Sequence, residues 1–468
     1  MMIHNVRMGF ATNSSSVHSL LLLRRGERLN DCLPKDRWFS HQHFTAASTP
    51  AKALYMALNI KDALLRMVNP ETADIIVKSL TGFDASAGGI DHQSIYALPL
   101  TPDLKGLNVQ FLKEFQAFML RKGLVILGGS DQAKPHPKLS SGRILDLNLP
   151  KDSYFPFIAR KDSRGYWTLF NPTTGTKLRI SWSGKNMAAS KADTPELVDL
   201  KITSFCPHGC PWCYQGSTKD GLHADSQALD AILLALEDLK VFEVAIGGGE
   251  PTLHPHFWHL LRRIRLNHHM VPNFSTRNLD WLYVPEKAAT VREFCGGFAV
   301  SVDDYPAIDK VVQACAAVQM PLDKVSIQYV VGTSSMGAEL VMERCRNYDL
   351  RCTLLGYKPM GRGRQWASMK DEWIIPFKKM LNDSERDFSK NIPKVGIDTC
   401  LARTSEQKLR KLGVERHSYE ILEGKFSMYI DAVNKTIGPS SFSSIRHRLP
   451  CRHGLEASVA MKSAFSRW

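Results

Sequence analysis

Three cysteines within eight residues are the densest group of potential metal ligands in this chain. Cys206, Cys210 and Cys213 follow a C-x3-C-x2-C spacing. Thiolates at this density select iron–sulfur clusters or zinc. On a cluster of four irons, three thiolates leave one iron without a protein ligand, where a substrate or cofactor could bind. The alternative is a zinc knuckle completed by His208 or a distant cysteine, although zinc sites normally combine two ligand pairs and only one is visible here.

The elements around these cysteines are expected to fix their position. Alternating apolar and β-branched residues over 197–203 predict a buried strand directly before the first cysteine. An amphipathic helix with Asp225 as its N-cap is expected after the last one. A second strand over 242–246 then leads into Gly247-Gly-Gly-Glu-Pro251. The predicted order is strand, cysteine loop, helix, strand and glycine-rich turn.

With this order of motifs the chain resembles the radical S-adenosylmethionine (SAM) superfamily. The resemblance rests on the three cysteines, on the aromatic Trp212 before the last of them, and on a Gly-Gly-Glu-Pro motif about 35 residues later. It implies that Cys206, Cys210 and Cys213 hold one [4Fe-4S] cluster. It also implies that the turn of Gly248, Gly249, Glu250 and Pro251 meets the amino group of SAM. Reductive cleavage of SAM would yield methionine and a 5′-deoxyadenosyl radical that abstracts hydrogen from a substrate, and the cofactor would carry this difficult step.

The rest of SAM would need further contacts, which we expect at later strand ends, where sites in parallel sheets lie. Polar candidates for the SAM carboxylate and ribose are Ser275, Thr276, Arg277, Asn278, Ser301 and Asp303. Candidates for the adenine are Trp212, Val331 and Leu355-Gly-Tyr357. Ordinary loop polarity explains the polar residues equally well. The segment 361–364, Gly-Arg-Gly-Arg, could grip an anionic substrate or form a basic turn, and no residue can be singled out as catalytic.

Alternation of strands and helices predicts the fold class. Six strands from residue 197 onward, joined by segments long enough for crossover helices, predict an α/β fold, a partial (βα)6 TIM-like barrel. This is also the fold that the resemblance implies. We expect this core at residues 195–365, after an α+β domain at 1–190 of unknown role and before a small basic extension at 366–468. A helix over 51–65 and a β-meander with strands at 155–159, 166–170 and 177–182 are expected in the first domain.

The C-terminal extension has a resemblance of its own, to the SPASM/twitch extension of radical SAM maturases. It rests on Asp398-Thr-Cys400, on 422–431 with its Tyr-Ile-Asp strand, and on Gly438-Pro-Ser-Ser-Phe442. In that family, cysteines at these places bind an auxiliary cluster. Here Leu422 and Ser440 stand at two aligned positions, Cys400 remains, and Cys451 lies eleven residues beyond Ser440. Two sulfurs do not make a four-cysteine site, so we predict the hairpin without a second cluster.

Composition and charge bound the cellular setting and the partners. No apolar run approaches the ~18 residues of a membrane span, so we expect no membrane association. Seven further cysteines are scattered without a disulfide pattern, which indicates a reducing cytoplasm. The net charge is +14, and residues 341–468 hold 24 Lys and Arg against 14 Asp and Glu, a net +10. This excess suggests an anionic partner, although a solvated basic surface would look the same.

Several functions remain open on these grounds. The basic C-terminal quarter favours a radical SAM enzyme that modifies nucleic acid, for instance viral or mobile-element bases. The twitch-like hairpin favours a maturase of a ribosomally made (RiPP-type) peptide instead. A small-molecule radical SAM enzyme and a non-enzymatic zinc or iron–sulfur protein are further alternatives. Any of the enzymes would need an external one-electron reductant of the flavodoxin or ferredoxin type.

Overall fold

The chain divides into two compact units, Met1–Ala188 and Ala189–Trp468. In the second unit, the computed structural model describes residues 191–334, 337–366, 369, 371–379, 395–414, 421 and 423–468. In the first unit it describes residues 2–7, 19–22, 30–33, 38–39, 44–65, 68–86, 88–90, 113–114, 116–117, 119–121, 124–128, 143–146, 158–173, 175 and 177–181.

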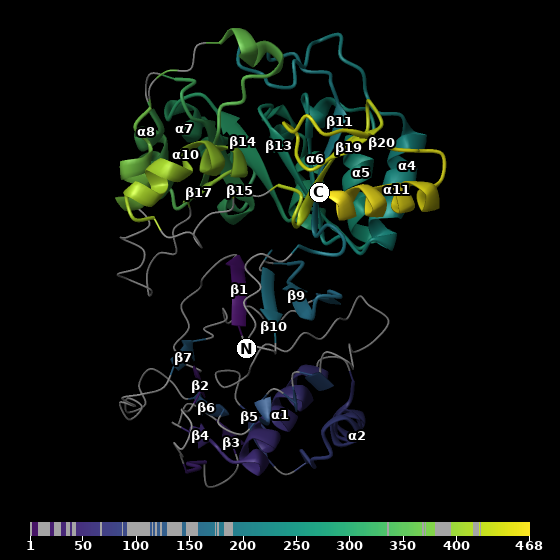
Figure 1. Cartoon of the computed structure of the whole chain (residues 1–468), viewed down its shortest axis with the longest axis vertical. Coiled ribbons are helices and arrows are strands. Elements are labelled where there is room, and N and C mark those ends of the chain that lie inside the picture. Colours follow the sequence, from purple (N-terminus) through teal and green to yellow (C-terminus); the bar gives the residue numbers. More distant parts are fainter. Residues whose placement is uncertain are drawn as a thin grey trace. The chain divides into compact units, whose positions relative to one another are not determined.

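The second unit is built on one ten-stranded sheet that contains all six predicted core strands (Figure 1). These strands are β11 (Leu197–Thr203), β12 (Glu243–Gly248), β13 (Val271–Thr276), β14 (Gly297–Val302), β15 (Val325–Val330) and β16 (Arg351–Leu355). Each pairs in parallel with the next one along the chain. The sheet order is β17-β16-β15-β14-β13-β12-β11-β18-β19-β20, whose two ends are different strands, so the sheet is open. The predicted partial barrel is thereby confirmed.

Helices follow the strands in regular alternation. They are α4 (Ser226–Asp238), α5 (Phe257–Leu266), α6 (Pro285–Phe294), α7 (Pro306–Ala317), α8 (Gly337–Asn347), α10 (Thr399–Lys411) and α11 (Gly454–Arg467). Figure 1 shows α7, α8 and α10 beside β14, β15 and β17, and α4 and α11 toward β11 and β19. Asp225 caps α4 as predicted, since its side chain accepts a hydrogen bond of 2.7 Å from the Ala228 N–H. Short 3-10 helices lie at η2 (Pro251–Leu253), η3 (Asp280–Tyr283), η4 (Leu322–Lys324) and η5 (Gly361–Gln365).

Strand β11 shows how burial divides the two faces of this sheet. Val198, Leu200 and Ile202 are buried in the same apolar core as α4. Because successive strand residues point to opposite faces, Asp199 and Lys201 lie on the other, inner face. Apolar burial against the helices therefore fixes which side chains the strand presents to the interior of the partial barrel.

Residues after 366 extend the core sheet on both sides. Strand β17 (Val395–Ile397) pairs in parallel with β16, and β18 (Ser427–Asp431) pairs in parallel with β11. Strand β19 (Thr436–Gly438) returns antiparallel to β18, so the predicted hairpin is present, and β20 (His447–Arg448) pairs with β19. The domain boundary at residue 366 stays a prediction, because these later strands belong to the same sheet as the core.

Side chains at the positions aligned with the auxiliary-cluster cysteines, and Cys451, have contacts within the protein. The Ser440 hydroxyl donates a hydrogen bond of 2.5 Å to Glu423, whereas Leu422 lies outside the described residues. The Sγ of Cys400, in the first turn of α10, lies 3.9 Å from the Tyr357 carbonyl oxygen. The Sγ of Cys451 lies 3.5 Å from the carbonyl oxygen of Leu449. The two sulfurs thus belong to separate local contacts, and the absence of an auxiliary cluster stays a prediction.

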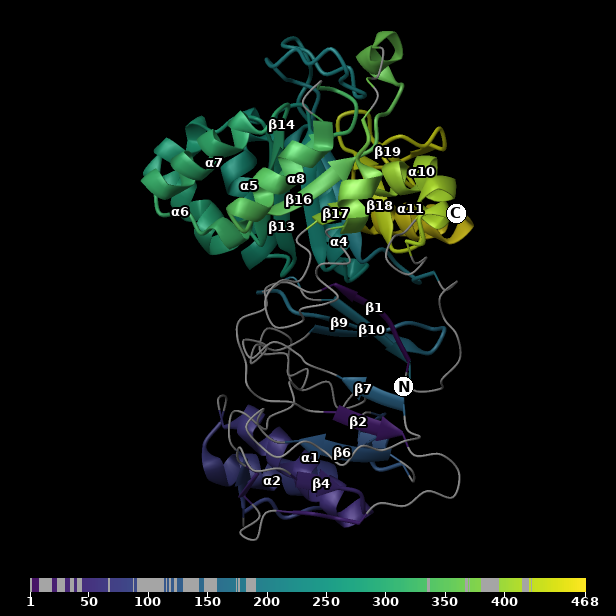
Figure 2. The same cartoon turned by 90° about the vertical axis from the view of Figure 1, so that its left-hand side faces the viewer.

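The first unit is an α+β assembly (Figure 2). The predicted meander is present as β8 (Ile158–Lys161), β9 (Tyr166–Phe170) and β10 (Lys177–Ser181), and β1 (Met2–Arg7) pairs with β10; residues 155–157 lie outside the described part. A second sheet has the order β4-β6-β2-β7, from Phe44–Ala46, Leu124–Gly128, Ser19–Leu22 and Arg143–Asp146, and β3 (Trp38–Phe39) pairs with β5 (Gly89–Ile90). Helix α1 (Thr49–Leu64) matches the predicted helix and is followed by α2 (Pro70–Thr81). In the part of the chain that the structure describes, no helix is long and apolar enough to span a membrane.

Candidate functional site

The cysteine loop follows β11 directly and folds back on itself. The Ser204 N–H donates to the Leu222 carbonyl oxygen at 2.7 Å, and the Cys206 N–H donates to that of Thr218 at 2.8 Å. These bonds close the base of the loop while its three cysteines remain partly exposed. The loop is therefore anchored by backbone contacts at the carboxyl end of β11, where a site in a parallel sheet is expected.

The glycine-rich turn after β12 lies in backbone contact with this loop. The Gly249 N–H donates to the Thr203 carbonyl oxygen at 2.8 Å, and the Glu250 N–H donates to that of Phe205 at 2.8 Å. A Cβ atom at Gly249 would meet the Phe205 oxygen at 2.1 Å, and Gly248 has a φ of +121°. Only glycine tolerates both conditions. The two motifs therefore form one backbone unit.

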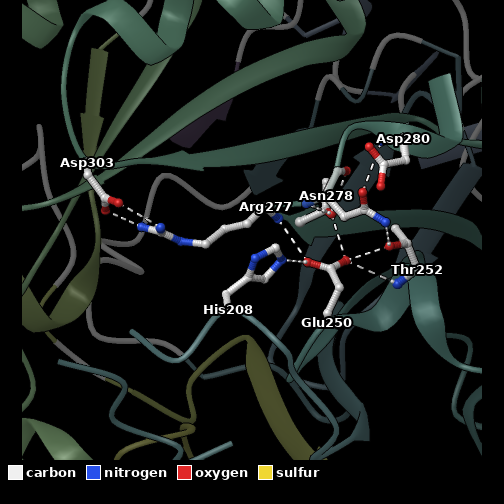
Figure 3. A network of polar contacts seen from close by, with 8 residues as sticks. His208, Glu250, Thr252, Arg277, Asn278, Asp280 and Asp303 are labelled. Carbon is white, nitrogen blue, oxygen red and sulfur yellow. Dashed lines mark hydrogen bonds and ion pairs between the residues drawn. The ribbon is translucent and has the colours of Figure 1, made fainter. Parts of the chain in front are cut away.

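Glu250 lies at the centre of a buried polar network (Figure 3). Its Oε1 accepts hydrogen bonds from the hydroxyls of Thr252 at 2.6 Å and Thr276 at 2.7 Å. Its Oε2 accepts from the Arg277 backbone N–H at 3.0 Å and lies 3.3 Å from Nε2 of His208. Burial acts to raise the pKa of this carboxyl, but the hydrogen bonds outweigh it and lower the pKa. Glu250 is thus an ionised, buried carboxylate whose hydrogen bonds join the cysteine loop, the turn and the end of β13.

His208 therefore contacts Glu250, which argues against the zinc alternative in which it completes a knuckle. Because an ionised carboxylate only accepts hydrogen bonds, Nε2 of His208 must carry the hydrogen. The sequence offered no signal for this contact, since 42 residues separate the two positions.

Arg277 and Asp303 form an ion pair next to the cysteine loop. The Arg277 Nη1 donates to Asp303 at 2.8 Å, and its Nη2 contacts the second carboxylate oxygen, so the pair is bidentate (Figure 3). Burial acts to lower the pKa of Arg277, but Asp303 and the sulfurs of Cys210 and Cys206 hold the pKa above its usual value. The guanidinium also lies 5.9 Å from the Trp212 ring centre. A fixed positive charge thus lies beside the thiols.

The other predicted cofactor contacts have mixed surroundings. Ser275 and Ser301 are half-buried near the ends of β13 and β14, and their hydroxyls have no hydrogen-bond partner among the described residues. The Asn278 side chain accepts from the Asp280 N–H at 3.0 Å and donates weakly to Thr252. The role of these three residues toward a cofactor stays a prediction.

The two adenine candidates on later strands are held by backbone contacts. The Val331 N–H donates to the Leu355 carbonyl oxygen at 2.9 Å, just after β15. The Tyr357 hydroxyl lies within hydrogen-bond distance of the carbonyl oxygens of Gly363 and Trp366, at 2.9 Å from the latter. Tyr357 therefore supports the η5 turn, and its contact with an adenine stays a prediction.

Arg362 is a site residue whose role the sequence did not indicate. Its Nε donates to the Cys210 carbonyl oxygen at 3.0 Å, its Nη1 to that of Ser217 at 2.7 Å, and its backbone N–H to that of Cys213 at 3.1 Å. These groups come from η5, after the sixth core strand. The Gly-Arg-Gly-Arg segment, which follows the sixth core strand, thus holds the cysteine loop, which follows the first. Neither of the two interpretations of this segment from the sequence included that role.

We expect Arg362→Ala to lose iron from a reconstituted protein about 10- to 100-fold faster than wild type, the range seen when outer contacts of a metal site are removed. The variant frees two carbonyl oxygens, those of Cys210 and Ser217, in the loop that carries the ligands. Iron release to a chelator, followed by absorbance under anaerobic conditions, measures the effect. Arg364→Ala is the matched control, because Arg364 is exposed in the same turn and its side chain has no partner among the described residues. Equal release from both variants would contradict this role of Arg362.

The three thiols fit a soft metal group, although they do not form a closed set of ligands. Within the described ranges, no three His, Cys, Asp or Glu side chains converge as a group that could hold a metal ion. Burial raises the pKa of the Cys206 thiol, and Glu250, Cys210 and Cys213 add to that rise. Burial also raises the pKa of Cys210, against the effect of Arg277. Binding must therefore release protons, and the donors are free, partly exposed thiols on one anchored loop.

Comparison with known proteins identifies relatives for this part of the chain. A family model described as "Radical SAM superfamily" matches residues 200–317. The mycofactocin maturase MftC of Mycobacterium ulcerans is 34% identical over 113 residues, which are 24% of this chain and 30% of that protein. MftC of Mycolicibacterium smegmatis is 36% identical over 98 residues, 21% of this chain and 24% of that protein. The chain thus spans less than a third of the length of these curated relatives.

Solved structures of SuiB from Streptococcus suis are also similar to the chain. SuiB bound to S-adenosylmethionine has a TM-score of 0.45 at 12% identity, covering 66% of this chain and 88% of that one. SuiB bound to the precursor peptide SuiA has a TM-score of 0.44 at 13% identity, covering 61% and 82%. The family match includes the cysteine loop and the Gly-Gly-Glu-Pro turn, the two motifs that the structure joins. Residues 200–317 of this chain, which carry both motifs, therefore match a radical SAM domain.

Proposed function

We propose that this protein is a radical SAM enzyme in which Cys206, Cys210 and Cys213 hold one [4Fe-4S] cluster and the Gly248–Pro251 turn contacts SAM. When bound, the cluster and SAM would supply a 5′-deoxyadenosyl radical that takes hydrogen from a substrate. The observation that carries the proposal is the pair of backbone hydrogen bonds from Gly249 and Glu250 to the base of the cysteine loop. These bonds hold the turn at a fixed distance from the loop that carries the metal ligands.

The surrounding residues would divide the remaining work. Glu250 already accepts five hydrogen bonds from protein groups, so the turn would offer its backbone polar groups to the SAM amino group. Arg277, beside the thiols, would supply positive charge near the SAM carboxylate. Arg362 would keep the ligand loop in place. An external one-electron reductant of flavodoxin or ferredoxin type, and a reducing cytoplasm that keeps the cysteines free, complete the proposal.

For the substrate, we propose a peptide in place of the nucleic acid that the net charge favoured. The support is the similarity to proteins named as mycofactocin maturases and the β18–β19 hairpin, which resembles the extension of such maturases. The charge of +14 is the observation on the side of nucleic acid. Because phosphate contacts make nucleic-acid binding steeply salt-dependent, binding to DNA or RNA that is strong at low salt and lost at moderate salt would support that alternative.

We expect anaerobic reconstitution to give about four irons per chain, and 5′-deoxyadenosine to form when SAM and dithionite are added. Iron analysis and chromatography of the nucleoside measure both. Stoichiometric zinc without SAM cleavage would refute the enzyme, and roughly eight irons would refute the single cluster. The substrate class is then read by supplying deuterated pools of peptides, nucleic acids or small molecules. Deuterium should reach 5′-deoxyadenosine from the peptide pool.

A further inference from the structure

The inner face of strand β11 carries charged side chains that the proposed cofactor site does not use. Asp199 and Lys201 lie on this face, and their parallel partners on β18 are Tyr429 and Asp431. Lys201 Nζ lies 3.1 Å from Asp431, and both side chains are buried. A charged inner face is unusual beside an apolar outer face, because buried charges are costly unless they are paired.

Lys358 approaches this face from the other end of the core sheet. It follows β16, which four strands separate from β11 in the sheet order. In a flat sheet the two strands would lie roughly 24 Å apart, at about 4.8 Å per strand. Yet Lys358 Nζ lies 5.0 Å from the ring centre of Tyr214 and 5.1 Å from that of Phe442. The charge of Lys358 also acts on Asp199 itself, against the effect of burial, to lower the pKa of its carboxyl. The sheet therefore curls, and the face that carries Asp199 is the interior of the partial barrel.

One carboxylate in this interior has no hydrogen-bonded partner among the described residues. Lys358 is paired with Asp398 at 3.0 Å, and Lys201 is paired with Asp431 at 3.1 Å. Arg446 also reaches this face, because its Cζ lies 5.1 Å from the ring centre of Tyr429, and its guanidinium donates to the carbonyl oxygens of Ile445 and Ser441. Three basic side chains and three aspartates therefore lie on this face among the described residues. Asp398 and Asp431 also accept backbone hydrogen bonds, whereas the Asp199 side chain has no hydrogen-bond partner in the described part of the chain. Asp199 is therefore the aspartate of these three that no described group pairs by hydrogen bonding.

Asp199 is surrounded by protein and yet reached by solvent. Burial raises the pKa of its carboxyl to about 6, although the charge of Lys358 acts to lower it. The residue is nevertheless exposed. A group that is both enclosed and solvent-accessible on the inner face of a curled sheet is in a position to meet a ligand. Perturbed carboxyls in such positions are typical of functional sites.

We propose that Asp199 anchors the substrate inside the partial barrel by accepting a hydrogen bond from a cationic nitrogen, an ammonium or guanidinium group of a peptide. A carboxylate without a hydrogen-bonded partner favours a cation, and both lysines described on this face are already paired with the other two aspartates. The inference rests on the proposed function, since it places the peptide on the inner face of the same sheet that carries the cluster loop.

SAM also carries an ammonium group, but the position of Asp199 along β11 separates it from the cofactor residues. Asp199 lies four residues before the end of the strand at Thr203, which corresponds to roughly 13 Å at 3.3 Å per residue. The cysteine loop and the glycine-rich turn begin beyond that end. The anchor and the cofactor would therefore contact different parts of the interior.

The test uses the full-length reconstituted protein and pools of short random peptides. One pool has an acetylated N-terminus and a fixed central lysine, and the second has norleucine there, which keeps the alkyl stem and removes the charge. A third has a free N-terminus and central norleucine. We expect wild type to bind one of the two cationic pools about tenfold or more tightly than the acetylated norleucine pool. A hydrogen bond to a charged group contributes enough binding free energy for such a difference. The preferred pool identifies a side-chain or an N-terminal cation.

Asp199→Asn keeps the shape of the side chain and removes the charge, so this preference should disappear. Asp323→Asn is the matched control, because Asp323 is an exposed carboxylate in η4, before β15 and away from the inner face of β11. Iron content and SAM binding are measured on all three proteins.

The outcomes separate this inference from the proposed function. No preference in wild type, or a preference that Asp199→Asn retains, would overturn the anchor. Loss of SAM binding in Asp199→Asn would also overturn it, because Asp199 would then belong to the cofactor site. Absence of 5′-deoxyadenosine from wild type would overturn the proposed function instead, while the peptide preference is still read by binding.

Discussion

Replacement of any one of Cys206, Cys210 or Cys213 by serine should reduce bound iron from about four per chain to nearly none and abolish 5′-deoxyadenosine formation. Two thiolates cannot hold a cluster that needs three, and a serine hydroxyl is a hard ligand with little affinity for such iron. The three variants should fail alike, because the ligands act as a unit. Iron and sulfide analysis with the visible absorbance spectrum of each reconstituted variant measures the loss.

Cys32→Ser is the matched control for this series, because Cys32 is an exposed free cysteine in the first unit. It should retain wild-type iron. Near-normal iron in any one of the three loop variants would mean that another residue completes the ligand set. Loss of iron from Cys32→Ser would mean that reconstitution loads the chain non-specifically.

Gly249→Ala should disrupt the site almost as severely, although it removes no ligand. The added Cβ would meet the Phe205 oxygen at 2.1 Å and its carbonyl carbon at 2.7 Å. These atoms are backbone, so the turn and the cysteine loop must separate, and the hydrogen bonds from Gly249 and Glu250 break. Each unsatisfied buried group costs about 1–3 kcal/mol. We expect a fall in SAM cleavage on the order of 100-fold and a lower melting temperature, measured by nucleoside formation and calorimetry.

Gly247→Ala offers the comparison within the same turn. No atom lies within 4 Å of the position that the added methyl group would take, and Gly247 has no positive φ. The variant should keep iron binding and SAM cleavage, and its melting temperature should be unchanged or slightly higher because alanine restricts the unfolded chain. Equal damage in both variants would show that the close approach at Gly249 is not what joins the motifs.

Local patterns predicted the fold well where neighbouring residues decide the structure. The alternation in Leu197–Thr203, the cap at Asp225 and the cysteine spacing are all short-range signals. The pairing of β18 with β11 was not predicted, because it joins residues more than 200 positions apart. Which strands meet depends on the whole sheet, and alternation within one strand carries no information on its partner.

The metal ligands of the site were predicted from the sequence, but the residues that hold the cysteine loop in place were not. Glu250 was expected to serve the cofactor, but five protein groups occupy its oxygens, and no sequence distance indicates such contacts. Arg362 was seen only as part of a basic segment. A signal for the interior did exist, since Asp199 and Lys201 interrupt an otherwise apolar strand at alternate positions. That pattern is typical of a strand with a polar inner face, a feature that the sequence interpretation missed.

The hydrogen bond from Arg362 to the Cys210 carbonyl spans 152 residues, and this has a consequence for how the protein is made. At ~5–20 residues per second, the ribosome adds Arg362 roughly 8 to 30 s after Cys210. During that interval the cysteine loop lacks its contacts with Arg362 of η5. Iron delivered to the nascent chain would meet an incompletely held loop, so cluster insertion should follow completion of the sheet. Long-range contacts of this kind also form slowly, which makes maturation of the holoprotein a late and separable step.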